Sequence, residues 1–210
     1  MATHKIDELN ILVRRRMYRE YFEVMDIPLA DRRKREKLAE DIDDVWIEIL
    51  AIYAVAREHQ MAVDLARIER EYLEKLSDVL RGAGVREEII QNYLDDVAVN
   101  EMEVTQKRYM DDPYWISAER SVEIATNDSN KIWHETEFID AVNSGKRFKR
   151  WMTMRDERVR DTHAEIDGVT IPINDAFVVG NSLMMFPGDT FTYGASLEEA
   201  VNCRCWLEYI

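Results

Sequence analysis

The chain has 210 residues, 46 % hydrophobic and 33 % charged, which excludes a disordered chain and lets a core form without disulfides or a metal. Its formal net charge of −14 argues against a protein that binds along DNA through an overall positive electrostatic potential. The first 37 residues are the exception, because they hold ten basic side chains against seven acidic ones. No secretory leader and no apolar run near the roughly 18 residues of a membrane span are present. We therefore expect a soluble protein of a reducing cytoplasm.

Apolar residues recur at three- and four-residue steps through most of the first 145 residues, which predicts helices. The expected helices cover 6–29, 35–80, 85–109 and 116–142. The stretch over 35–80 is either one long rod or two helices that fold back at a break near 58–60. The polar patch at 127–130 is poor in helix formers, so a kink or break is allowed there.

After Gly145 the pattern changes to short alternating stretches that are typical of strands. The expected strands cover 148–153, 169–172, 177–180, 184–186 and 203–210. Asp156 is expected to cap a short helix that ends at Gly168, and Ser196 with Glu199 has the form of a capping box. The sequence thus predicts an α+β fold, with a helical region over 1–145 and a small mixed module of short antiparallel strands over 146–210.

One histidine and the two cysteines are the candidates for chemistry, because the usual nucleotide-binding and hydrolase motifs are missing. His163 shares a helix face with apolar neighbours, so its ordinary interpretation is a buried hydrogen-bonding residue beside Asp161 or Asp167. Cys203 and Cys205 are separated by one residue, and a disulfide between them would be strained.

Three functional alternatives remain for these residues. His163, Cys203 and Cys205 could bind Zn²⁺, because imidazole and thiolate suit this ion, although a single intervening residue is shorter than the usual spacing. A cysteine could instead act as a nucleophile with His163 as its base. A general acid–base role of His163 with Asp167 is the third alternative.

Two basic stretches are candidate nucleic-acid contacts. Aromatic residues interleave with cations in the second stretch, as they do in grooves that bind single strands. The alternatives are a solvated helix face for the first stretch and an edge strand with outward charges for the second. The candidate contact residues are Arg14, Arg15, Arg16, Lys146, Arg147, Lys149 and Arg150.

Four motifs follow one another in a recognisable order. They are Lys149-Arg-Trp-Met-Thr, Asp156-Glu-Arg-Val-Arg-Asp-Thr-His-Ala-Glu-Ile-Asp-Gly168, Phe186-Pro-Gly-Asp189 and Val201-Asn-Cys-Arg-Cys205. Together with the helix before them, over residues 116–205, they closely resemble the C-terminal module of the phage Mu F-like head morphogenesis family. The motif positions expected to be structural are Trp151, Asp156, Arg158, Arg160, Asp167, Gly168, Pro187, Gly188 and Asn202.

The resemblance implies a minor capsid protein, present in few copies in the procapsid and inside the virion head, and assembled in the host cytoplasm. Its implied partners are the portal protein and the major capsid or scaffold protein, with weak contact to viral DNA, an influence on DNA ejection and no membrane. The helical region over 1–145 would serve portal or capsid contact, or self-association. The resemblance does not imply a proven enzyme, and no cofactor follows from it with certainty, although Zn²⁺ is possible. The alternative is a metal- or cysteine-dependent hydrolase or transferase built on His163, Cys203 and Cys205.

Overall fold

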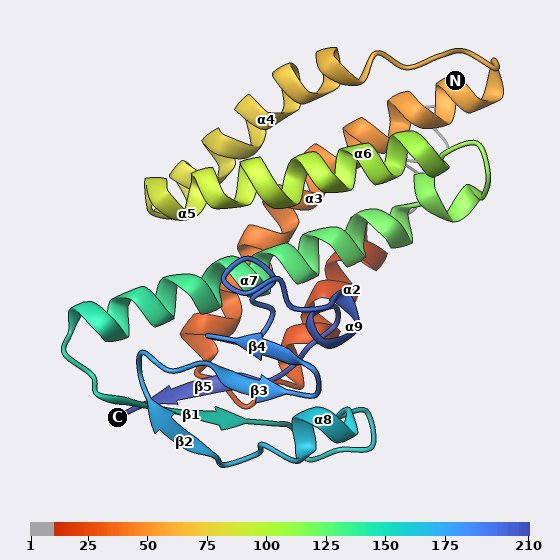
Figure 1. Cartoon of the computed structure of the whole chain (residues 1–210). Coiled ribbons are helices and arrows are strands. Elements are labelled where there is room, and N and C mark those ends of the chain that lie inside the picture. The colour runs from red at the N-terminus through yellow and green to blue at the C-terminus, as the bar shows by residue number, and fades with distance from the viewer. Residues whose placement is uncertain (1–10) are drawn as a thin grey trace. The chain divides into compact units, whose positions relative to one another are not determined.

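The computed structural model describes residues 11–210, with helices followed by short strands (Figure 1). The helices are α2 (Ile11–Glu23), α3 (Leu29–Glu58), α4 (Leu65–Gly82), α5 (Glu87–Asn92), α6 (Val99–Arg108), α7 (Ala118–Asn143), α8 (Asp161–Ala164) and α9 (Leu197–Ala200). A π-helical segment, Tyr93–Ala98, joins α5 to α6, and a 3-10 turn, Pro113–Ile116, precedes α7. The strands are β1 (Phe148–Met152), β2 (Thr170–Pro172), β3 (Phe177–Val179), β4 (Ser182–Met184) and β5 (Trp206–Tyr209). The α+β class is confirmed.

The chain forms two compact units. Among the described residues, the helical unit comprises 11–22 and 33–129, and the C-terminal unit comprises 23–32 and 130–210. Whether residues 146–210 fold by themselves, as the expected domain division implies, stays a prediction. None of the helices in the described part of the chain combines the length and the apolar character needed to cross a bilayer.

The break in the second helical stretch is confirmed, and the continuous rod is wrong. α3 ends at Glu58, and α4 starts after Asp64, whose side chain accepts a hydrogen bond from the backbone N–H of Arg67 at 3.2 Å. Lys75 on α4 donates to Glu48 on α3 at 2.6 Å, a pairing that requires the two helices to fold back on each other. α4 also contacts α5 and α6, which lie beside it in Figure 1.

Other helix boundaries differ from expectation. α2 ends at Glu23 rather than near residue 29, and the part of this expected helix before residue 11 lies outside the described residues. α7 continues through the polar patch at 127–130 without a break. Hydrogen bonds to the patch from outside the helix, described below, offset its low helix propensity.

The C-terminal unit is built on a three-stranded antiparallel sheet with the order β2-β1-β5, and β3 pairs with β4 in a separate hairpin. β1 is therefore the central strand, and its interpretation as an edge strand is wrong. The last strand starts at Trp206 instead of residue 203. The core of this unit contains Trp151, Phe177, Val179, Met184, Met185, Phe186, Ala195, Cys203, Cys205 and Leu207.

The short helix of this unit is also shorter than expected. α8 covers only Asp161–Ala164, and the residue at its N-cap is Arg160. Asp156 instead closes a turn by accepting a hydrogen bond from the backbone N–H of Arg158 at 3.1 Å. The chain then returns to the sheet, where the Gly168 N–H donates to the Trp151 carbonyl at 2.7 Å.

Candidate metal centre

One histidine and two cysteines meet inside the C-terminal unit. Nδ1 of His163 lies 3.3 Å from Sγ of Cys205 and 3.6 Å from Sγ of Cys203. The three potential ligand atoms lie within 4.8 Å of one another, and each side chain is at most 4 % exposed. Neither cysteine forms a disulfide in the described part of the chain. The structure thus brings together the three residues that the sequence proposed as metal ligands.

Local structure explains this meeting. His163 lies on α8, with its ring edge-on to the indole of Trp151 at a centroid distance of 5.6 Å. Cys203 and Cys205 belong to the segment that leads into β5. Side chains two residues apart in an extended chain point to the same side, so the short spacing delivers both thiols to one ring nitrogen. The amide of Asn130, on α7, fixes this segment by donating to the carbonyl of Cys203 at 3.0 Å.

Glu199 completes the cluster, and sequence reasoning assigned it another role. Its Oε2 lies 3.1 Å from Nε2 of His163 and accepts a hydrogen bond from the Thr162 hydroxyl at 2.8 Å. Ser196 stands at the N-cap of α9 without a side-chain capping bond, so the expected capping box is wrong. The carboxylate partner of His163 is consequently Glu199, and neither Asp161 nor Asp167.

The carboxylate of Glu199 determines how the imidazole is oriented. Nε2 of His163 faces this carboxylate, and Nδ1 faces the two sulfur atoms. The charged ring donates on both sides, whereas a neutral ring with its proton on Nε2 donates to Glu199 and presents a lone pair to the sulfur atoms. Histidines that bind metals commonly donate their other N–H to a carboxylate in this way. The arrangement has the outer-shell contact of a metal-binding histidine.

The two thiols differ in acidity. A hydrogen bond from Cys205 and a second one from His163 lower the pKa of Cys203 well below its ordinary value, against the effect of burial. The bond to Cys203 and burial raise the pKa of Cys205. Burial lowers the pKa of His163, but the interaction with Cys203 outweighs it and the net direction is upward. The cluster therefore favours one thiolate, which is the form of cysteine that binds metals.

A small pocket borders the cluster and all three potential ligands. Its volume is about 10 Å³, which is room for about one water. Arg158, Arg160 and Arg204 also line it. A water or a metal-bound water fits this space, whereas a substrate of several atoms does not.

The motif residues around the cluster hold its loops in place. Asp156 forms a two-fold ion pair with Arg204, at 2.7 and 2.8 Å, and this pair lowers the pKa of the Asp156 carboxyl. Arg160 donates to the carbonyl of Val201 at 2.5 Å. Asn202, between these contacts, has a left-handed backbone with φ of 56°. Each contact fixes the position of the segment that carries the two cysteines.

A second group of motif residues organises loops further from the thiols. Asp167 accepts hydrogen bonds from the backbone and hydroxyl of Thr153, at 2.9 and 3.1 Å, and from Arg155 at 2.6 Å. Asp189, fully buried after Pro187 and Gly188, accepts from the backbone N–H of Met185 at 2.9 Å. These contacts connect the loops of the C-terminal unit to one another; a purely structural role for the motif residues stays a prediction.

The candidate nucleic-acid contacts do not form one surface. Arg14 is 7 % exposed and pairs with Asp43 at 2.9 Å, and Lys149 is fully buried and donates to the carbonyl of Met185 at 2.8 Å. A surface role for these two residues is wrong because neither cation reaches solvent.

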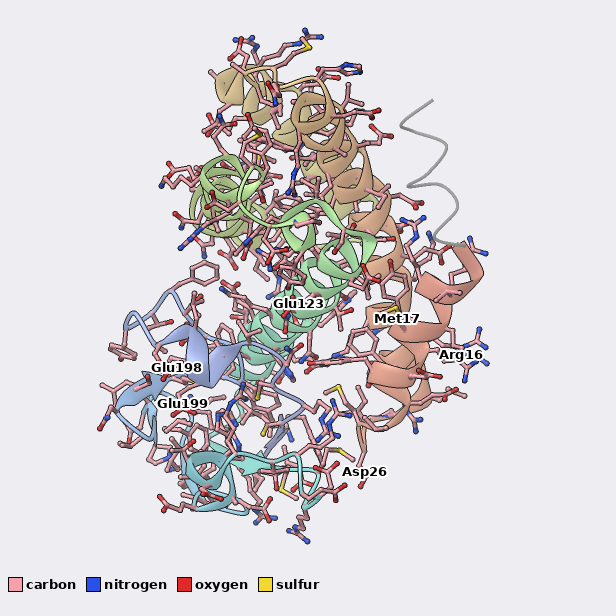
Figure 2. The ribbon with its side chains drawn as sticks, turned by 90° about the vertical axis from the view of Figure 1, so that its right-hand side faces the viewer. Arg16, Met17, Asp26, Glu123, Glu198 and Glu199 are labelled. Carbon is pink, nitrogen blue, oxygen red and sulfur yellow. The ribbon has the colours of Figure 1, made fainter. Side chains whose placement is uncertain are left out.

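The remaining cations are partly neutralised. Arg15 pairs with Glu40, and Arg150 pairs with Glu208 at 3.4 Å. Arg16 projects outward from α2 in Figure 2 and pairs with Glu20 at 2.6 Å. Lys146 and Arg147 are exposed at the start of β1.

Comparison with known proteins gives one match. Residues 79–208 match the family described as "Phage Mu protein F like protein", which is more than half of the chain. The chain belongs to the phage Mu F-like family. It is accordingly a phage head morphogenesis protein, associated with the capsid and its components. Neither the curated proteins nor the solved structures contain a match to this chain.

Proposed function

We propose that this phage Mu F-like protein is a minor component of the procapsid that binds the portal protein during head assembly. The observation that carries the proposal is the extent of the family match, which starts in α4 and ends in β5. The match therefore includes α5, α6 and α7 as well as the sheet. The family unit thus combines a set of packed helices with the cysteine–histidine module, and the helices supply area for protein contact.

An apolar groove between α3 and α4 supports protein contact. It encloses about 470 Å³ and is lined mostly by apolar side chains, including Ile52, Val55, Ile68 and Tyr72, together with the charged residues Asp64, Arg67 and Glu71. Met61, at the turn between the helices, is 57 % exposed and borders the same groove. Grooves of this kind receive the apolar face of a partner helix. We propose that a helix of the portal protein binds here.

Particle composition tests the proposal. The chain is co-expressed with the portal, scaffold and major capsid proteins of the same phage, and procapsids are purified and analysed by quantitative mass spectrometry. We expect a low copy number that depends on the portal protein. A chain that is absent from procapsids, or that enters them equally well without the portal protein, contradicts the proposal.

Two charge substitutions test the groove. Met61→Glu places a charge in the groove and is expected to reduce incorporation about tenfold or more, because a buried charge opposes apolar contact. Met110→Glu is the matched control, since Met110 is 46 % exposed and lies outside the groove. Equal incorporation of the two variants, with unchanged helical circular dichroism, would refute the groove as the contact surface.

DNA contact is a secondary part of the proposal. Lys146 and Arg147 are exposed, but the chain carries a net charge of −14. We expect retention of DNA only at low salt, because a few phosphate contacts bind weakly and are screened. Mobility-shift assays over a series of salt concentrations measure the fraction of DNA bound. Binding that is equally strong at all salt concentrations would contradict a contact made through a few phosphates.

A cysteine-dependent hydrolase or transferase is the second candidate, and one observation favours it. Glu199, His163 and Cys205 are aligned as an orienting acid, a base and a nucleophile would be. Rapid alkylation of one cysteine by iodoacetamide at neutral pH, unaffected by zinc or chelator, would support this enzyme. Alkylation that is slow while zinc is bound and becomes rapid only after a chelator is added would count against it.

A further inference from the structure

We propose that His163, Cys203 and Cys205 bind one Zn²⁺ ion, with Glu199 as the residue that positions the histidine. This inference does not depend on the portal contact, because it concerns the interior of the C-terminal unit alone. The ion would join α8 to the segment before β5, and so it would hold these two parts of the unit together.

The distances suit a tetrahedral zinc site. With Zn–N of about 2.0–2.1 Å and Zn–S of about 2.3 Å, neighbouring ligands of a tetrahedron lie about 3.5 Å apart for nitrogen and sulfur. Nδ1 of His163 lies 3.3 and 3.6 Å from the two sulfur atoms. A catalytic nucleophile–base pair uses one sulfur atom and one ring nitrogen. Here a second sulfur atom lies at a similar distance from the same nitrogen, and such a pair does not require it. The geometry therefore favours a metal ion at the centre of the three atoms.

The surroundings supply the other parts of a zinc site. Glu199 binds Nε2 of His163 and so keeps Nδ1 available as the ligand. The pocket beside the ligands has room for about one water, which would complete the tetrahedron. The ion's positive charge would stabilise both cysteines as thiolates and thus offset the cost of burying them.

Metal analysis of the full chain is the first test. The protein is purified without chelator, dialysed, and analysed by mass spectrometry for metals, and we expect about one zinc per chain. Cys203→Ser, Cys205→Ser and His163→Ala should each lose the zinc. His59→Ala is the matched control, because His59 is exposed at the end of α3 and should leave the zinc content unchanged. A wild-type chain that holds no zinc, even after incubation with equimolar Zn²⁺, overturns the proposal.

Cobalt substitution identifies the ligands without relying on variants that could fail to fold. The Co²⁺ form of the wild-type chain should show a thiolate-to-cobalt charge-transfer band and the intense visible bands of tetrahedral coordination. In parallel, both thiols should resist iodoacetamide until a chelator removes the metal. Absence of the charge-transfer band, or alkylation at the same rate with and without metal, overturns the proposal.

The role of Glu199 has its own test. Glu199→Gln should bind zinc about 10- to 100-fold more weakly, because outer-shell partners of metal ligands have effects of this size. It should also shift the visible bands of the cobalt form. Glu198→Gln is the matched control, because Glu198 is the exposed neighbour on α9 (Figure 2). If both variants bind zinc as the wild type does, Glu199 is not a positioning residue.

Discussion

A glycine at the end of the β3–β4 hairpin controls the space available to Glu199. Gly180 has a φ of +57°, and a Cβ atom built on it would lie 2.6 Å from Oε1 of Glu199 and 3.0 Å from the side chain of Thr162. The long Glu199 side chain can move to relieve this contact, and we expect that movement to disturb the hydrogen bond between its Oε2 and His163. The absence of a side chain at this position thus permits the hydrogen bond that orients the imidazole.

Gly180→Ala is therefore expected to weaken zinc binding in the same direction as Glu199→Gln. Gly194→Ala is the control, because Gly194 also has a positive φ, +66°, but a Cβ atom added there would meet no other atom within 4 Å. Both substitutions cost about 1 kcal/mol of backbone strain, so Gly194→Ala controls for this cost, and only Gly180→Ala adds the contacts with Glu199 and Thr162. Competition titration with a chromogenic chelator measures the zinc affinity. Equal affinities in the two variants would show that the contact with Glu199 has no effect.

Lys149 is buried at the centre of the sheet, where sequence reasoning placed a surface cation. Its Nζ donates to the Met185 carbonyl and lies 4.7 Å from the ring centre of Phe138 and 5.5 Å from that of Phe177. Burial lowers the pKa of Lys149 to about 8. The alternating pattern along β1 correctly predicted a strand. It did not show that other strands, β2 and β5, would pair with both of its edges.

Replacing Lys149 should change how stability depends on pH. The folded-state pKa lies below the unfolded value of about 10.4, so the unfolded chain binds more protons between these values and stability rises with pH. Between about pH 7.5 and 9.5 the wild type should gain about 2 kcal/mol of unfolding free energy relative to Lys149→Met. Urea denaturation across this range measures the difference. Relative to Lys146→Met, a substitution at an exposed position, the wild type should show no such gain.

The site shows what sequence reasoning finds and what it misses. Residue chemistry and motif order pointed to His163, Cys203 and Cys205, because few residue types bind metals. Glu199 was missed because it lies in a pattern that also describes a helix cap, and only the fold brings it to His163. The family resemblance over 116–205 is narrower than the observed match over 79–208, since the helices carry periodicity but no distinctive motif.

At the scale of elements, α7 shows why local propensity can fail. Its polar patch looked like a helix breaker, but neighbouring elements satisfy these polar groups. Asp128 accepts a hydrogen bond from Tyr93 of the π-helical segment at 2.8 Å, and Ser129 donates to the carbonyl of Arg35 on α3 at 2.7 Å. Contacts that are distant in sequence thus replace the local ones that would end the helix. The residues next to the patch in the sequence do not reveal these partners, because Tyr93 and Arg35 are far from it along the chain.

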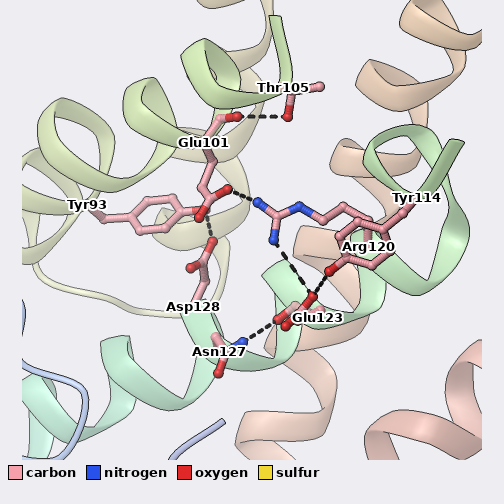
Figure 3. Close-up of polar contacts among 8 residues, drawn as sticks. All are labelled: Tyr93, Glu101, Thr105, Tyr114, Arg120, Glu123, Asn127 and Asp128. Atoms are coloured by element: carbon pink, nitrogen blue, oxygen red, sulfur yellow. Dashed lines mark hydrogen bonds and ion pairs between the residues drawn. The ribbon is translucent and has the colours of Figure 1, made fainter. Parts of the chain in front are cut away.

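Tyr93→Phe should consequently destabilise the helical unit. The Tyr93 hydroxyl is bonded to a buried carboxylate, and loss of such a bond costs about 1.5–3 kcal/mol. Figure 3 also shows the control, Tyr114, whose hydroxyl bonds to Glu123 at a position that is 39 % exposed. Tyr114→Phe should cost less than about 1 kcal/mol because water replaces the bond. Urea denaturation followed by circular dichroism compares the two, and equal losses would contradict the role of burial.

At the scale of the whole molecule, a bound zinc ion would stabilise one of the two units. The three ligands all belong to the C-terminal unit, and the helical unit holds none of them. A ligand that binds only the folded state adds about 2.7 kcal/mol when its free concentration is a hundred times its dissociation constant. The two units should therefore respond differently to loss of the metal.

A chelator should raise hydrogen exchange in residues 148–210 and leave that of residues 65–108 unchanged. Exchange followed by peptide mass spectrometry measures both regions in one sample of the full chain. Cys203→Ser protein is the control and should exchange rapidly in residues 148–210 with or without chelator. Equal increases in both regions would show that the units do not unfold independently, and no increase would show that the ion is not structural.

The order of the strands has a consequence for biosynthesis. β1 pairs on one side with β2, which follows soon after it, and on the other side with β5, which the ribosome makes much later. A nascent chain therefore exposes one edge of β1 until residues 206–209 emerge, and an open edge accepts any suitable strand. Two neighbouring nascent chains could exchange β5, and each exchanged strand would bring its cysteines to the histidine of the other chain. Prompt capture of zinc within one chain would prevent this exchange.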